Sequence, residues 1–320
     1  MKANPGRCCR RCWRSIPHKR LVVTGFISRS EAGETVLLGR NGSDYSATQI
    51  GALAGVNRVT IWSDVAGVYS ADPRKVSDAC LLPLLRLDEA SELALLAAPV
   101  LHTRTLQPVS NSDIDLQLRC SYQPEQCSTR IERVLASGTG ARIVTSHDDV
   151  CLVEIQIPDS HDFATQQKEI DLLLKRAQLR PLAMSIHPDR RLLQLCYTSE
   201  VVNSAFNLLQ DAALPGHLQL RDGLALVALV GAGVTRNPLH RHRFWQQIKD
   251  QPVEFVWQSE DHISLVAVLR VGPTQHLIQG LHQSLFRAEY TEVVYLILTG
   301  IGGIWRELMG FLEVRSDFWI

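Results

Sequence analysis

The sequence predicts an α/β fold made of a partial sheet domain over residues 21–135, followed by two ferredoxin-like α+β modules over residues 142–290. Three observations support this fold class. In the first region, apolar strand-length segments alternate with helix-period segments across glycine turns. In the second, the order β-α-β-β-α-β occurs once and then begins again. A chain of 320 residues with 45% hydrophobic and 21% charged residues can bury a core in each region.

The composition argues against several classes of partner. Lys plus Arg and Asp plus Glu number 33 each, so no overall basic field would recruit nucleic acid. No apolar run reaches the roughly 18 residues of a membrane span. Eight scattered cysteines in a chain of this size favour a reducing compartment, so we expect a cytoplasmic protein with neither nucleic acid nor membrane as partner.

Residues 1–20 differ from the rest, because seven Lys and Arg residues occur there without one acidic residue. Three cysteines and a histidine in this segment suggest a zinc knuckle, but adjacent cysteines fit the usual spaced ligand pairs poorly. A secretory signal is disfavoured as well, since no apolar core follows the basic residues. We expect a disordered or non-native leader and no metal site.

Order is expected to begin with a buried strand at residues 21–27 and a second strand at residues 36–38. A glycine turn, residues 39–44, then leads directly into a helix with apolar residues at helical spacing. Ser43 or Asp44 can cap this helix, whose free N–H groups favour an anionic ligand. Arg40 can grip a carboxylate with two hydrogen bonds. An ordinary capped helix start is the alternative reading of the same residues.

The next strand, residues 58–62, leads into a long polar loop at residues 63–74. Loops at the carboxyl ends of strands are where open α/β sheets bind their ligands. Because the glycine turn and the polar loop both adjoin strands, we expect them to face one shared cleft.

Together, the two segments resemble the aspartate kinase branch of the amino-acid kinase family. The turn reads G-R-N-G-S-D here and G-R-G-G-S-D in that family, and the loop resembles the family pattern W-T-D-V-x-G-[IV]-Y-x-x-D-P-R. The similarity extends through residues 99–102, 106–108 and 128–130. The sequence of residues 58–74 is most similar to that of the bifunctional aspartokinase–homoserine dehydrogenase II type.

The resemblance implies a partial amino-acid-kinase-type sheet in residues 21–135 and ATP-dependent phosphorylation of the side-chain carboxylate of L-aspartate, with Mg²⁺ on the phosphates. Aspartate would be held by the turn residues Arg40, Gly42, Ser43 and Asp44. ATP would be contacted by the loop residues Ser63, Asp64, Tyr69 and Arg74.

The sequence departs from the family pattern in three places. Pro99 stands where many relatives have a lysine near the nucleotide phosphates, and Cys127 stands where glycine is usual. No K-F/Y-G-G segment, which supplies the catalytic lysine and phosphate-binding glycines of the family, precedes the turn. We therefore expect an incomplete enzyme that does not transfer phosphate alone.

Residues 142–290 read as two ferredoxin-like copies. The first has strands near 151–157, 182–186, 191–197 and 218–220, and helices near 170–177 and 200–212. The second starts with the strand 224–230 and continues with helices near 240–249 and 275–287 and strands near 253–257 and 263–269. After an aspartate kinase, such a pair resembles its ACT modules, which bind small amino acids and join subunits into homo-oligomers.

The resemblance places an amino-acid effector at the turn formed by Gly231, Ala232, Gly233 and Val234, where backbone groups can clasp it. A tight turn before a helix is the alternative interpretation. A dinucleotide fingerprint is excluded, because Arg236 stands where the third glycine would be. A non-catalytic ACT-type protein that binds amino acids or joins subunits is the competing function.

Residues 291–320 resemble a degraded start of the Rossmann-like homoserine dehydrogenase domain that follows ACT modules in the bifunctional enzymes. A dinucleotide unit needs about 30 residues and an acidic ribose ligand about 20 residues after its glycines. We expect no NAD to bind this tail.

Overall fold

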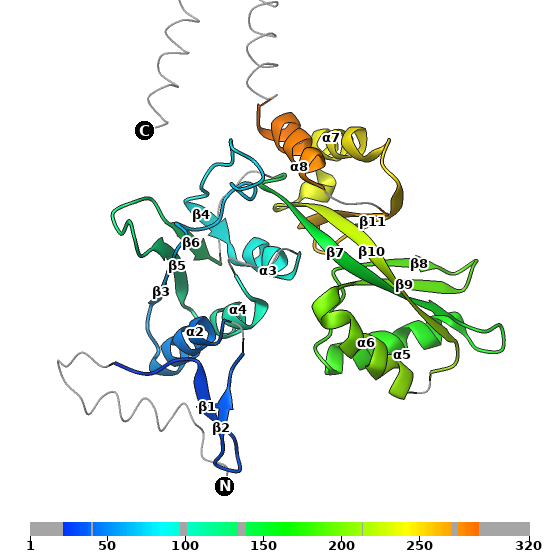
Figure 1. The fold of residues 1–320 in the computed structure, drawn as a ribbon, viewed down its shortest axis with the longest axis horizontal. Helices are drawn as coiled ribbons and strands as arrows, with labels where there is room; N and C mark the ends of the chain where they lie inside the picture. Colours follow the sequence, from blue (N-terminus) through cyan, green and yellow to red (C-terminus); the bar gives the residue numbers. More distant parts are fainter. Residues whose placement is uncertain are drawn as a thin grey trace, which may run out of the picture.

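The computed structural model describes residues 22–39, 41–96, 101–133, 139–212, 214–270 and 274–287. The expected leader 1–20, Arg40, Pro99 and the expected Rossmann-like tail 291–320 lie outside these residues. Figure 1 shows two parts, one from residue 22 to 133 and one from 139 to 287. No helix in the described ranges is long and apolar enough to cross a membrane.

The first part contains a small hairpin and a four-stranded sheet. The hairpin pairs β1 (Ile27–Arg29) with β2 (Thr35–Leu37). The sheet has the order β3-β5-β6-β4, with β3 and β5 parallel, β4 and β6 parallel, and β5 and β6 antiparallel. Its strands are β3 (Arg58–Ser63), β4 (Leu84–Arg86), β5 (Asp115–Cys120) and β6 (Thr129–Glu132).

Three helices accompany this sheet: α2 (Gly42–Ala54), α3 (Leu87–Leu96) and α4 (Thr103–Ser110). Helix α2 ends at Gly55, whose φ of 69° suits glycine, and the chain then turns into β3. Strand, helix and strand therefore follow one another as the apolar pattern predicts.

The buried strand expected at residues 21–27 is wrong for the described residues. Val22 is 94% exposed, and strand structure starts only at Ile27. Phe26 has a φ of 70°, a left-handed conformation that interrupts an extended chain, so the apolar run enters the hairpin outside the sheet.

The second part is one antiparallel sheet of six strands in the order β11-β12-β10-β7-β9-β8. Its strands are β7 (Ile143–Gln156), β8 (Ala183–His187), β9 (Leu192–Thr198), β10 (His217–Val230), β11 (Val253–Gln258) and β12 (Ser264–Leu269). Its helices are α5 (Phe163–Arg176), α6 (Ser199–Asp211), α7 (Pro238–Ile248) and α8 (Gln275–His282). The predicted pair of ferredoxin-like modules is confirmed.

The two modules share their long strands β7 and β10. Residues 150–156 of β7 pair with β9 and with residues 217–224 of β10, forming module 1 with β8, α5 and α6. Residues 143–147 of β7 pair with residues 226–230 of β10, forming module 2 with β11, β12, α7 and α8. Module 2 therefore takes its fourth strand from a segment that precedes module 1 in the sequence.

Buried apolar side chains form three clusters. One lies under α5 and α6 in module 1, and a second lies under α7 and α8 in module 2. The third runs from the four-stranded sheet, including Leu85 and Leu116, to strand residues such as Leu226 and Val268. This third cluster joins the two parts through continuous apolar packing.

Candidate functional site

The glycine turn is built by backbone conformations that few residues adopt. Gly39 has a φ of 78° and Asn41 a φ of 54°, both left-handed. A side chain at Gly42 would meet the Leu38 Cβ at 2.9 Å and the Phe26 Cδ2 at 3.1 Å, so only glycine fits. At the start of α2, Gly42 is therefore buried and the next residue, Ser43, is exposed.

The helix cap differs from the expectation that Ser43 or Asp44 would cap α2. Asn41 occupies the N-cap position and makes no side-chain hydrogen bond, while Ser43 and Asp44 lie in the first turn. The N–H groups of a first turn have no partner within their helix. The Gly42 N–H already donates to the Gly39 carbonyl at 3.0 Å, so the N–H groups of Ser43 and Asp44 are the ones that could meet an anion.

Asp44 is half-buried in this first turn, and burial raises the pKa of its carboxyl above the usual range. A carboxylate at a helix N-terminus is also stabilised by the helix dipole. Asp44 is therefore a poorly hydrated acceptor beside open backbone donors, an arrangement that suits a zwitterionic ligand.

The polar loop between β3 and β4 is pinned to the sheet at its base. The Thr129 hydroxyl accepts a hydrogen bond from Val68 N at 2.9 Å and donates one to the Leu82 carbonyl at 2.7 Å. Gly67 lies against this threonine, so closely that a Cβ would approach Thr129 Oγ1 to 2.2 Å. Ser63 and Asp64 thus stand at the carboxyl end of β3, and Tyr69 and Arg74 follow further along the loop.

Two of the loop's polar groups are already paired within it. The Ser63 hydroxyl donates to the Asp64 carboxylate at 2.9 Å. The Arg74 guanidinium donates two hydrogen bonds to Asp72, at 3.0 and 2.9 Å, and these hold the pKa of Asp72 below its usual range. Arg74 remains 77% exposed, so its outer face is free to meet a ligand.

Comparison with known proteins gives the family. A family model for the Amino acid kinase family matches residues 14–120. The chain is 78% identical over 309 residues to the bifunctional aspartokinase/homoserine dehydrogenase 2 of Escherichia coli (strain K12), covering 94% of this chain and 38% of that protein. It is 29% identical to an aspartokinase of Bacillus sp. (strain MGA3), covering 83% of this chain and 66% of that protein.

The solved structure of E. coli aspartokinase III in complex with aspartate and ADP matches the fold with a TM-score of 0.74. The identity is 25%, with 82% of this chain and 60% of that chain covered. The chain belongs to the aspartate kinase family. It spans 38% of the length of the bifunctional relatives from E. coli and Haemophilus influenzae (strain ATCC 51907 / DSM 11121 / KW20 / Rd).

No hydrogen bond or ion pair among the described residues joins the turn at 41–44 to the loop at 63–74. The shared cleft stays a prediction. The roles assigned to these residues, Arg40 included, likewise stay predictions.

The turn at residues 231–234 is engaged by other residues of the same chain. Ala232 N donates to Glu89 Oε1 on α3 at 2.8 Å, and its carbonyl accepts from Gly140 N at 2.7 Å. A Cβ on Gly231 would approach the Gly140 carbonyl to 2.0 Å, so glycine is required there. Effector binding at this turn stays a prediction, and here its N–H already holds a carboxylate.

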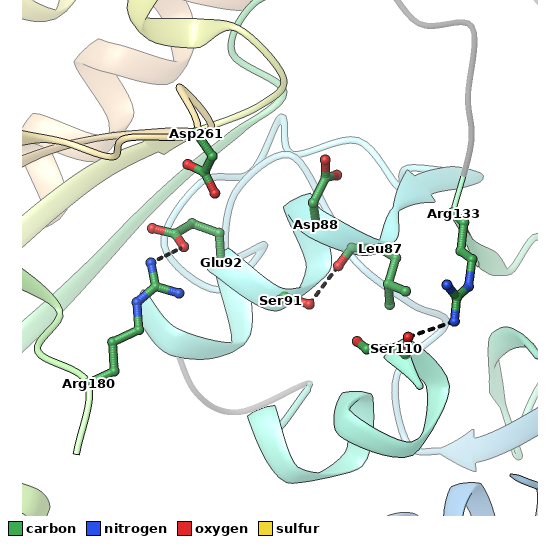
Figure 2. Close-up of a pocket in the computed structure, with 8 residues that line it drawn as sticks. All are labelled: Leu87, Asp88, Ser91, Glu92, Ser110, Arg133, Arg180 and Asp261. Carbon is green, nitrogen blue, oxygen red and sulfur yellow. Dashed lines mark hydrogen bonds and ion pairs between the residues drawn. The ribbon is translucent and has the colours of Figure 1, made fainter. Parts of the chain in front are cut away.

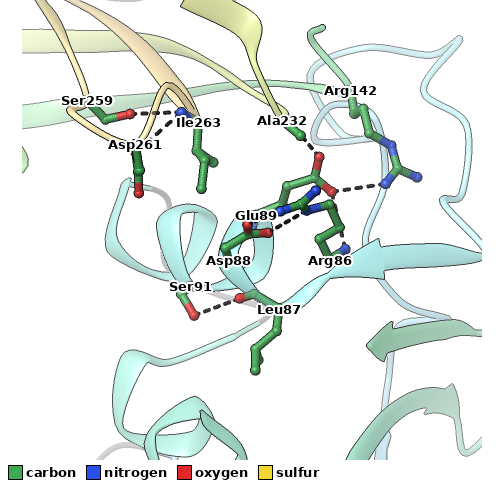
Figure 3. Close-up of polar contacts among 10 residues, drawn as sticks. All are labelled: Arg86, Leu87, Asp88, Glu89, Ser91, Arg142, Ala232, Ser259, Asp261 and Ile263. Carbon is green, nitrogen blue, oxygen red and sulfur yellow. Dashed lines mark hydrogen bonds and ion pairs between the residues drawn. The ribbon is translucent and has the colours of Figure 1, made fainter. Parts of the chain in front are cut away.

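Glu89 is a residue that sequence reasoning missed. Its side chain is fully buried between α3 and the turn, where it also accepts from the Arg142 guanidinium at 3.0 Å (Figure 3). Nearby, Glu92 accepts from Ser264 at 2.6 Å and from Arg180 at 3.1 Å. These two glutamates of α3 connect the first part, residues 22–133, to both modules.

Arg104 was missed as well. It donates to the Leu38 carbonyl at 3.2 Å, and its guanidinium carbon lies 5.9 Å from the centre of the Tyr45 ring. An exposed cation therefore stands beside the proposed aspartate turn. Its position at the start of α4, far from the turn in sequence, gave no signal of this contact.

A cavity of about 400 Å³ lies where α3 and α4 face the modules. Figure 2 shows Arg180 pointing to Glu92 on one side and Arg133 pointing to Ser110 on the other. None of the proposed aspartate or nucleotide residues lines it. It belongs to the contact between the two parts.

Proposed function

We propose that this chain carries the aspartate-binding turn and the nucleotide loop of an aspartate kinase. The observation that carries the proposal is the 78% identity to a bifunctional aspartokinase across 94% of this chain, with both segments present. The fold match to an aspartokinase solved with aspartate and ADP supports it. The reaction is transfer of the ATP γ-phosphoryl group to the side-chain carboxylate of L-aspartate.

In this reaction a carboxylate oxygen of aspartate attacks the γ-phosphorus, and the bond to the oxygen that bridges the β- and γ-phosphorus breaks. Aspartyl phosphate and ADP are the products. Phosphoryl transfer asks a protein mainly for positioning and charge neutralisation. Mg²⁺ enters with ATP as part of the substrate and neutralises phosphate charge.

The aspartate site is proposed at the start of α2. The positive end of the helix and Arg40 attract the substrate carboxylates, and Asp44 accepts hydrogen bonds from the substrate ammonium group. Gly42 keeps the turn in shape beneath the substrate, because a larger residue would collide with Leu38 and Phe26.

The nucleotide is proposed to lie against the loop, with Ser63 and Asp64 at one end and Tyr69 and Arg74 further along. The exposed face of the Arg74 guanidinium can meet the phosphates while its other face stays on Asp72. A phosphate is a strong acceptor for a guanidinium.

Modules 1 and 2 are proposed to bind a small amino-acid effector, with the turn at 231–234 as a candidate contact. E. coli aspartokinase III has been solved with lysine and aspartate, and that structure matches this chain with a TM-score of 0.60 at 25% identity. The competing function, a non-catalytic protein that binds amino acids through the modules, predicts effector binding without nucleotide binding.

The test is turnover in a catalytically active assembly that contains this chain. Arg40→Ala and Asp44→Ala should each lower aspartyl phosphate formation at least about a hundredfold, because single charge-stabilising contacts can be worth that much. Trapping the product with hydroxylamine measures it. Asp113→Ala, an exposed aspartate outside both segments, is the matched control and should keep full activity. Unchanged turnover in both test variants would remove the assigned roles.

A further inference from the structure

The nucleotide loop packs against module 2 as well as against the four-stranded sheet of the first part. Ala71 and Val76 are each only 3% exposed, and both belong to the apolar cluster of module 2 with Phe244, Ile278 and Leu281. The backbone joins as well, because Val144 N at the start of β7 donates to the Ser70 carbonyl at 2.8 Å. The segment between Tyr69 and Lys75 thus packs against module 2.

A buried polar contact lies beside Tyr69. The Ser70 hydroxyl is 2.8 Å from Nε2 of His282 on α8, and both side chains are less than 5% exposed. The same hydroxyl accepts a hydrogen bond from Cys80 N at 2.9 Å. Loss of a buried hydrogen bond leaves a desolvated partner behind, so this contact resists displacement of the loop.

A second group of polar contacts holds the loop beside Arg74. The Lys75 ammonium donates to Asp148 at 2.8 Å and to the Ser146 hydroxyl at 3.1 Å, both on β7. Asp148 in turn accepts from the backbone and hydroxyl of Thr274, where α8 begins. Partial burial acts to raise the pKa of Asp148, but the hydrogen bonds from Lys75 and Thr274 outweigh it and keep that pKa low.

The Lys75 carbonyl is also held, because the Gln279 side-chain amide on α8 donates to it at 2.8 Å. Lys75 is therefore fixed at both its ammonium and its backbone by module 2. Since Arg74 is the neighbouring residue, its backbone position follows from these contacts.

We infer that module 2 is a structural part of the nucleotide site, with Asp148, Thr274 and His282 acting as positioning residues that hold the loop through Lys75 and Ser70. The inference rests on the proposed role of Tyr69 and Arg74 in nucleotide binding. Because the carboxyl half of β7 is a central strand of module 1, the same strand links both modules to the loop.

Preorganisation explains why these distant residues matter for binding. A loop that is held in its bound conformation does not lose that conformational entropy again when the ligand arrives. Removing one of these contacts should therefore weaken nucleotide binding, although the residue that is changed does not contact the nucleotide.

The experiment is calorimetric titration of the purified chain with Mg²⁺-ATP, for wild type, Asp148→Ala and Ser70→Ala. We expect the dissociation constant to rise about five- to thirtyfold in each variant, the range that follows from losing one buried or charged hydrogen bond. Asp148→Asn, which keeps an acceptor, should recover part of the loss. Aspartate affinity should change less than about twofold, which a general loss of folding would not allow.

Glu254→Gln is the matched control, because it removes a partly buried carboxylate from the modules without contacting the loop. It should leave ATP affinity unchanged. Hydrogen exchange of the amides of residues 64–80 gives a second readout and should speed up in Asp148→Ala and Ser70→Ala but not in Glu254→Gln. Equal ATP affinity and equal exchange in wild type and Asp148→Ala would overturn the inference. A wild-type chain that binds no ATP would instead overturn the proposed function, and this inference with it.

Discussion

At the scale of single residues, Glu254 is the centre of an ion-pair network inside the modules. Its carboxylate accepts from Arg221 at 2.9 and 3.2 Å and from Arg270, and its side chain is 7% exposed. Arg221 also donates to Glu154 on β7 at 2.7 Å. The hydrogen bonds from Arg221 lower the pKa of Glu254 to about 2 despite its burial. The network ties β11 to β10 and β7.

This pKa predicts a pH dependence of folding stability. A carboxyl with a depressed folded pKa stabilises the protein fully above its unfolded pKa, near 4.5, and loses that contribution as the pH falls toward 2. We expect urea denaturation to show a loss of about 2 kcal/mol from this group between pH 5 and roughly pH 2. Glu254→Gln lacks the titration and should lose less over the same range. Identical pH profiles for the two proteins would contradict the assignment.

Some site residues could be predicted from sequence because the information is local. The turn at 39–44 and the loop at 63–74 are continuous segments with distinctive residue types. Glu89, Ser70 and Lys75 could not be selected that way. Their partners Ala232, His282 and Asp148 lie 143, 212 and 73 residues away, and no local pattern encodes such pairings. The N-cap was misassigned because Asn41, not Ser43 or Asp44, adopts the left-handed conformation there.

At the scale of elements, the alternation of apolar residues predicted the strands but not their continuity. Residues 218–220 and 224–230 read as two strands separated by Asp222 and Gly223, which resemble a turn. In the structure they form the single strand β10, with a register shift and a φ of 71° at Gly223. A bulge and a turn use the same residue types, so only the tertiary pairing distinguishes them.

The two longest strands of the modules, β7 and β10, are interior strands of the sheet. β7 lies between β10 and β9, and β10 lies between β12 and β7, so neither has a free edge. Among the described residues, the sheet edges are β8 and β11. Ile186 on β8 is 38% exposed. Self-association stays a proposal, and the β8 edge is the place where it is now expected.

We therefore predict that the purified chain self-associates and that Ile186→Lys shifts it toward the monomer, because a buried lysine opposes edge pairing. Light scattering coupled to size-exclusion chromatography at micromolar concentration measures the mass. Leu239→Lys, at an exposed apolar residue of α7 in module 2, is the control and should not change it. A wild-type protein that is strictly monomeric would count against this arrangement.

At the scale of the whole molecule, the first part and the modules are joined by apolar packing and by buried carboxylates. Glu89 is the most completely enclosed of these, with Ala232 N, Arg86 N and the Arg142 guanidinium as donors. Removing the Glu89 carboxylate leaves these donors buried without an acceptor. The free-energy cost of those unpaired donors is larger than the net contribution of the contact itself.

Glu89→Ala is accordingly predicted to lower the free energy of unfolding by about 3–5 kcal/mol. It should also separate one cooperative transition into two, because the parts would no longer be coupled across α3. Glu89→Gln keeps acceptors for the backbone donors and should cost less. Differential scanning calorimetry distinguishes these outcomes, and a single transition with unchanged stability in Glu89→Ala would show that the carboxylate does not join the parts.

We propose that one chain presents an aspartate turn and a nucleotide loop to a common cleft. A crystal structure of this chain with aspartate and ADP bound tests this arrangement most directly. We predict aspartate against Gly42 and Asp44 at the start of α2, and ADP against Tyr69 and Arg74, with the aspartate side chain facing the phosphates. Ligands bound on opposite faces of the sheet, or away from both segments, would contradict it.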